Sequence, residues 1–81
     1  RSSGILLECR TSEPGMQLYT GNFLSTSNIV GKGGKSYADR AGFCLETQHY
    51  PNAMEHPEFP SVVLPAGELY DTTTEYHISL L

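Results

Sequence analysis

Glu46 is the residue in this sequence best suited to act as a general acid or base. It lies in the short run GFCLET at residues 42–47, where the preceding neighbours are apolar. Removal of a carboxylate from water raises its pKa, and a raised pKa suits a general base near neutral pH. The same pattern also fits a glutamate that faces water and takes part in no chemistry, which is the more common case. The residues alone leave both interpretations open.

Gln17 and Tyr19 are the second candidates. In the run from Met16 to Thr20 apolar and polar residues alternate, so Gln17 and Tyr19 share one face of an extended strand. An amide and a phenol together offer the hydrogen-bond donors and acceptors that a sugar site needs. An ordinary polar outer face gives the same pattern and is again the more common case.

The other reactive residue types give weaker signals. Zinc sites place two ligands a few residues apart, and the histidines here have no such partner; they are His49, His56 and His77. We therefore expect no metal site. A nucleophilic pair of Cys44 with His49 is conceivable but unspecific, and Cys44 is better interpreted as a small buried residue. The run GKGGK at residues 31–35 lacks the spacing of a phosphate-binding loop.

Charge and length exclude several classes of protein. Nine acidic against five basic residues give a net charge of −4 without a basic cluster, so we expect no nucleic-acid partner. Apolar runs reach only three residues, whereas a membrane helix needs about 20. Two cysteines, Cys9 and Cys44, fit one disulfide, but two buried thiols in a cytosolic protein are the better expectation. With 38% hydrophobic residues in 81, and a start at Arg1, we expect part of a larger protein.

Period-two alternation and scattered turn residues predict an all-β chain. We expect strands or β-rich segments at residues 5–11, 16–20, 42–47 and 70–81, with a brief strand or extended segment at 62–64. The first two strands look like neighbours in one sheet. This pattern favours an antiparallel β-sandwich.

Turns and loops are predicted between these strands. Glu13-Pro14-Gly15 has the composition of a turn in which the glycine is free to take a positive φ, and Pro65-Ala66-Gly67 predicts another turn. The polar, glycine-rich stretch at residues 25–36 predicts a mobile surface loop. Three prolines in residues 50–60 should prevent regular structure over most of that stretch.

Three segments together resemble a known family. EPGMQLYTGNFL (13–24), GFCLETQHYPNA (42–53) and FPSVVLPAGELYDTTT (59–74) are similar to the C-terminal part of aldose 1-epimerases, the galactose mutarotases. The motifs occur in the family's order and cover nearly the whole chain. The sequence departs from the family at Asn52, where Asp is usual, and at Ala66 in the Pro-Gly turn.

The resemblance implies a large antiparallel β-sandwich of which residues 1–81 form the last strands. Members of the family interconvert the α and β anomers of a free hexose such as galactose or glucose by acid–base ring opening. Glu46 falls on the family's catalytic base, and Gln17 falls on a glutamine that contacts the substrate. The general acid is a histidine from an upstream segment, and no histidine of this chain matches its motif. These 81 residues alone should therefore be inactive.

The resemblance also implies an enzyme without cofactor or metal, cytoplasmic and monomeric, whose partners are an aldohexose and the N-terminal part of the same enzyme. Tyr19 and Asn22 would be structural, and His49 would either anchor a loop or line the site. Three alternatives stay open: a relative that binds sugar without turnover, an inactive fragment, and a relative that acts on hexose 6-phosphates.

Overall fold

The computed structural model describes residues 2–81, whose regular structure consists of strands joined by turns. The strands are β1 (Ile5–Thr11), β2 (Gly15–Tyr19), β3 (Cys44–Gln48) and β4 (Thr74–Leu80). Three single turns of 3₁₀ helix lie between them, at η1 (Leu24–Ser27), η2 (Lys32–Gly34) and η3 (Ala53–Glu55). No α-helix occurs within residues 2–81, and accordingly no helix there is long and apolar enough to span a membrane. The prediction of a β-rich chain is confirmed.

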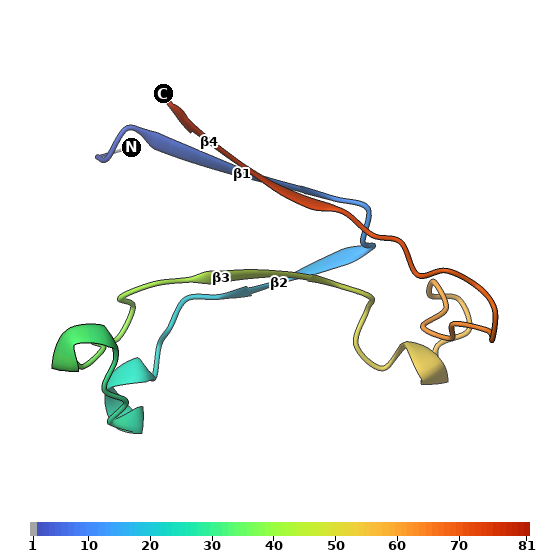
Figure 1. Ribbon diagram of the computed structural model, residues 1–81, viewed down its shortest axis with the longest axis horizontal. Coiled ribbons are helices and arrows are strands. Elements are labelled where there is room, and N and C mark those ends of the chain that lie inside the picture. Colours follow the sequence, from blue (N-terminus) through green and yellow to red (C-terminus); the bar gives the residue numbers. More distant parts are fainter. Residues whose placement is uncertain (1) are drawn as a thin grey trace. The chain divides into compact units, whose positions relative to one another are not determined.

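β1 and β4 form an antiparallel pair from opposite ends of the chain. The register runs from Ile5 opposite Leu80 to Thr11 opposite Thr74, and the two ribbons lie side by side in Figure 1. Beyond the strand end, the Ser12 amide donates to the Thr73 carbonyl at 3.1 Å. Regular strand begins only at Thr74, so the predicted β-rich segment at 70–81 is shorter than expected at its start.

β2 and β3 form a second two-stranded sheet. The expectation that the first two predicted strands are neighbours in one sheet is therefore wrong, because β1 pairs with β4 and β2 pairs with β3. The hydrogen bonds of β1 and its continuation go to the β4 side of the chain, where Thr11 Oγ1 also donates to the Thr73 carbonyl at 3.0 Å. Figure 1 shows β2 and β3 running alongside each other.

The two predicted turns differ in their chemistry. At Pro65–Glu68 the Glu68 amide donates to the Pro65 carbonyl at 3.1 Å and Gly67 has φ +87°, as a type II turn requires. The turn before β2 does not use a positive φ at Gly15, so that part of the prediction is wrong. Gly15 instead provides space, since a Cβ there would lie 3.0 Å from ring carbons of Tyr50.

In the polar surface loop between β2 and β3, the carboxylate of Asp39 accepts two hydrogen bonds from Ser25. The Ser25 amide and hydroxyl both donate to Asp39, at 2.9 and 2.8 Å, and the amide is the main reason why the pKa of Asp39 is lowered. These hydrogen bonds connect η1 with the part of the loop that leads into β3. The segment predicted as a brief strand or extended segment at residues 62–64 has no regular secondary structure.

No hydrophobic residue among the described ones is buried. Cys9 is half-buried and Cys44 is exposed, and both are free thiols. The prediction of buried thiols is therefore wrong for Cys44, because the strands offer no core in which to bury it. The chain divides into two compact units, one of residues up to Met16 with Thr47–Leu81, the other of Gln17–Glu46.

Candidate functional site

The lengths and the pairing of β2 and β3 place Gln17 opposite Glu46. Each strand has five residues, and they pair antiparallel only with each other, so the ladder begins with Gly15 opposite Gln48 and places Gln17 opposite Glu46. In agreement, a Cβ at Gly15 would lie 3.5 Å from the Gln48 carbonyl oxygen. Directly opposite residues share a face, with Cβ atoms about 4.5–5.5 Å apart. The fold thus brings together two residues that are 29 positions apart in the sequence.

Both side chains are exposed on this face. The sequence pattern suggested a carboxylate at the end of a buried strand, whereas the structure leaves the Glu46 side chain exposed. They supply a carboxylate, which accepts protons and hydrogen bonds, beside an amide, which donates two hydrogen bonds and accepts others. Such a pair can hold a hydroxyl group and remove its proton.

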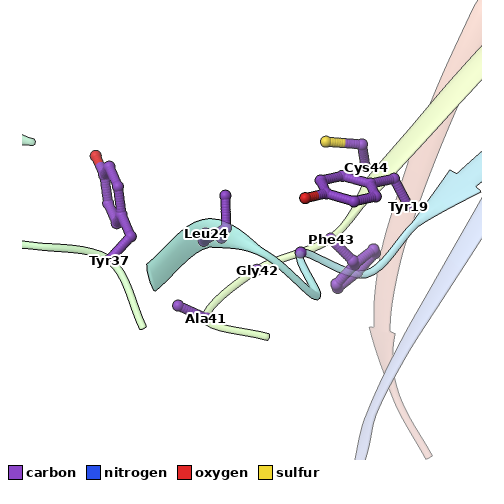
Figure 2. Close-up of a pocket in the computed structure, with 8 residues that line it drawn as sticks. Tyr19, Leu24, Tyr37, Ala41, Gly42, Phe43 and Cys44 are labelled. Atoms are coloured by element: carbon purple, nitrogen blue, oxygen red, sulfur yellow. The ribbon is translucent and has the colours of Figure 1, made fainter. Parts of the chain in front are cut away.

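Tyr19 and Cys44 continue the same face. They end the ladder opposite each other, two residues along each strand from Gln17 and Glu46. A pocket of about 280 Å³ adjoins them, and Figure 2 shows the Tyr19 ring and the Cys44 thiol at one end of it. Its other lining residues come from the loop and the start of β3; they are Gly21, Leu24, Tyr37, Ala41, Gly42 and Phe43.

A buried carboxylate, Glu13, organises a second polar cluster that the sequence did not reveal. Its side chain is only 4% exposed. The Tyr70 hydroxyl donates to Oε1, and His49 Nδ1 lies 2.9 Å from Oε2. The Glu13 amide also donates to Thr11 Oγ1 at 3.0 Å. His49 and Tyr70, two partners of the carboxylate, lie 36 and 57 residues away in the sequence, so only the three-dimensional structure brings them together.

Hydrogen bonding in this cluster favours a charged carboxylate and a neutral phenol. The hydrogen bond from the Tyr70 hydroxyl is the main reason why the pKa of Glu13 is lowered, and the hydrogen bond from Thr72 is the next largest cause. The bond to Glu13 is likewise the main reason that the pKa of Tyr70 is raised. His49, whose role the sequence left open between loop anchor and site residue, pairs here with Glu13.

The remaining histidines are paired with neighbouring carboxylates at the surface. His56 Nδ1 lies 3.1 Å from Glu58, and His77 Nε2 lies 3.0 Å from Glu75. The latter contact is the main cause of a lowered pKa at Glu75. Across residues 2–81, no three histidine, cysteine or acidic side chains gather as a metal site would require.

Comparison with known proteins decides the family. The family model described as aldose 1-epimerase matches residues 1–77. The chain belongs to the aldose 1-epimerase family. Galactose mutarotase of Bos taurus is 50% identical over 78 residues, which are 96% of this chain and 22% of that protein. Galactose mutarotase of Homo sapiens is 49% identical over 79 residues, 98% of this chain and 23% of that protein.

A bacterial aldose 1-epimerase is also similar to this chain. Aldose 1-epimerase of Escherichia coli (strain K12) is 39% identical over 72 residues, 86% of this chain and 20% of that protein. The chain thus spans about a fifth of the length of the aldose 1-epimerases that it matches. The resemblance noted in the three sequence motifs is confirmed, and the opposed pair Gln17 and Glu46 lies inside the matched region.

Proposed function

We propose that this chain is the C-terminal part of an aldose 1-epimerase β-sandwich, and that it carries the catalytic base of the enzyme. The single observation that supports this most is the direct opposition of Gln17 and Glu46 on one sheet face. In the proposed reaction Glu46 removes the proton of the anomeric hydroxyl of a free hexose, while Gln17 holds a sugar hydroxyl beside it. No cofactor or metal takes part.

Ring opening also needs an acid. As Glu46 accepts the anomeric proton, an acid protonates the ring oxygen, the bond between the anomeric carbon and that oxygen breaks, and an open-chain aldehyde forms. Rotation about the bond between carbons 1 and 2 presents the other carbonyl face. The ring oxygen then attacks, its proton returns to the acid, and Glu46 gives its proton to the new anomeric oxygen. All atoms and protons balance over the cycle.

The acid in this proposal is a histidine of the upstream part of the enzyme. The histidines of this chain support that assignment, since each pairs with a carboxylate of its own: His49 with Glu13, His56 with Glu58 and His77 with Glu75. The complete enzyme would be a single sandwich domain, cytoplasmic and monomeric, and the 81 residues alone would not turn over sugar.

The test uses a complete enzyme made by joining this chain to bovine galactose mutarotase in place of the segment that it matches. Mutarotation of α-D-galactose is followed by polarimetry. Glu46→Gln should lower kcat by about 10²- to 10⁴-fold, the usual contribution of a general base. Glu8→Gln is the matched control, because Glu8 is an exposed glutamate of β1 that pairs with Arg10 at 3.1 Å; it should leave kcat unchanged.

The outcomes separate the alternatives. A Glu46→Gln variant that keeps more than a tenth of kcat contradicts the assignment of the base. A complete enzyme that binds galactose without turnover would be a carbohydrate-binding relative. Turnover of glucose 6-phosphate in preference to galactose would instead place the protein among relatives that act on hexose phosphates.

A further inference from the structure

The sheet face that carries Gln17 and Glu46 does not end with them. Tyr19 and Cys44 follow on the same face, about 7 Å along each strand, since each residue of an antiparallel strand advances about 3.4 Å. All four residues belong to the compact unit of Gln17–Glu46. The distance between the two pairs is therefore comparable to the length of a whole hexopyranose with its hydroxyl groups.

The pocket beside Tyr19 and Cys44 has the size and chemistry for part of a small molecule. Its volume of about 280 Å³ lies just below the usual range of ligand pockets, about 300–1,000 Å³. Among the described residues that line it, none is charged, and three are aromatic: Tyr19, Tyr37 and Phe43. In Figure 2 the Tyr19 ring lies at the rim next to the Cys44 side chain.

A hexopyranose has two kinds of surface. Its hydroxyl groups need polar partners, which Gln17 and Glu46 supply at the reacting end. Its C–H groups form apolar patches, which an aromatic ring can cover while the phenol hydroxyl of a tyrosine still reaches a sugar hydroxyl. The arrangement of a polar pair next to an aromatic pocket on one face matches these two surfaces.

We propose that this pocket is the subsite for the non-reacting carbons of the aldose ring. Tyr19, for which the resemblance implied a structural role, would contact the sugar, and Cys44 would form part of the pocket wall. This inference rests on the proposed function of Glu46. Contacts to the non-reacting carbons form in the ground state and persist through ring opening. Their loss should therefore raise KM more than it lowers kcat.

The first experiment measures protection of Cys44 in the complete enzyme defined above. Iodoacetamide alkylates the cysteines, and mass spectrometry of peptides follows each one with and without galactose. At ten times its Kd, galactose leaves about one site in eleven empty, so alkylation of Cys44 should slow about tenfold. Cys9, half-buried on β1, is the internal control and should react at an unchanged rate. An equal rate at Cys44 with and without galactose overturns the proposal.

The second experiment does not depend on thiol reactivity. Tyr19→Ala should raise KM for galactose about 3- to 10-fold with kcat within about twofold, as expected for a lost aromatic contact. Tyr19→Phe, which keeps the ring, should recover most of the KM. A Tyr19→Ala enzyme with unchanged KM, or with a lower kcat alone, overturns the proposal.

Failure of this subsite and failure of the proposed function give different results. If turnover depends on Glu46 but Cys44 is unprotected and Tyr19→Ala has normal KM, only the subsite is wrong. If the complete enzyme has no mutarotase activity at all, the proposed function fails, and galactose protection of Cys44 then reports sugar binding alone.

Discussion

The 81-residue chain, purified alone, should not unfold cooperatively. Its accessible surface is 6819 Å², whereas a folded monomer of 8.9 kDa is expected to expose about 4,800 Å². The excess is about 2,000 Å². If about 57% of it is apolar, as on ordinary protein surfaces, about 1,100 Å² of apolar surface stays in water that a folded protein of this size would bury.

The free energy involved decides the outcome. At about 25 cal/mol per Å², that apolar surface corresponds to about 30 kcal/mol of missing stabilisation. The net stability of a whole domain is only about 5–15 kcal/mol. The side chains concerned are visible in the sequence as the apolar members of each strand, such as Leu18 at 57% and Ile78 at 76% exposure. We therefore expect the strand pairs to form only when other strands cover them.

Urea titration followed by far-UV circular dichroism tests this directly. The isolated chain should change its signal gradually, without a sigmoidal transition, and its amide NMR spectrum should be poorly dispersed. The complete enzyme is the control and should show a single sharp transition. Sedimentation must show that the isolated chain is monomeric, because self-association would bury the same surface. A cooperative transition in a monomeric isolated chain would refute the reasoning.

Three further predictions concern the complete enzyme. The pKa of Glu13 is lowered in the folded state, so its carboxylate stabilises the fold above the unfolded pKa, and this stabilisation is lost as pH falls through the folded pKa. Glu13→Gln should therefore weaken the dependence of the thermal unfolding temperature on pH at acid pH. An unchanged dependence contradicts this. Gly21→Ala should destabilise more than Gly33→Ala in urea titration. Both glycines have positive φ, costing about 1–2 kcal/mol, but only at Gly21 would a Cβ lie 2.9 Å from Leu24 and 3.1 Å from a backbone carbonyl; equal losses would count against it. Asp39→Ala should speed hydrogen exchange at the Ser25 amide, while Asp39→Asn, which keeps an acceptor, should change it less; equal exchange in both variants argues against this role.

Local chemistry predicted most of the fold's elements but not their partners. Alternation predicted the segments that became β1, β2 and β3, because a strand's period is visible in the sequence itself. Pairing is a long-range property. β1 pairs with β4 at the other end of the chain, and the hydrogen bond from Thr11 to Thr73 spans 62 residues of sequence. No local pattern predicts such hydroxyl and amide contacts.

The turn before β2 shows why a correct local prediction can have the wrong cause. Pro14-Gly15 does bend the chain, but glycine is needed there to leave room for the ring of Tyr50, a residue 35 positions away. The contacts of Glu13 with His49 and Tyr70 could not be predicted for the same reason. A carboxylate before Pro-Gly signals nothing by itself until the fold supplies its partners.

The candidate site was predictable only through family resemblance. From pattern alone Glu46 and Gln17 were ordinary polar residues of alternating strands, and their role in sugar chemistry stays a proposal. What the structure adds is the register that sets them opposite each other. Equal strand lengths and a single partner for each strand fix that register without any reference to function.

The two faces of the β2–β3 sheet carry different side chains, and this connects the candidate site with the packing of the sheet. The face opposite Gln17 and Glu46 carries Met16, Leu18 and Leu45, of which Met16 and Leu18 are about half exposed. A slip of one residue between the strands would put Gln17 and Glu46 on opposite faces of the sheet and would mix apolar with polar side chains on each face. Packing of the apolar face against further strands therefore does two things at once. It would stabilise the sheet, and it would keep Gln17 and Glu46 together on the other face, where we propose that the sugar binds. For this reason we expect loss of packing and loss of catalysis to occur together when that apolar face is disrupted.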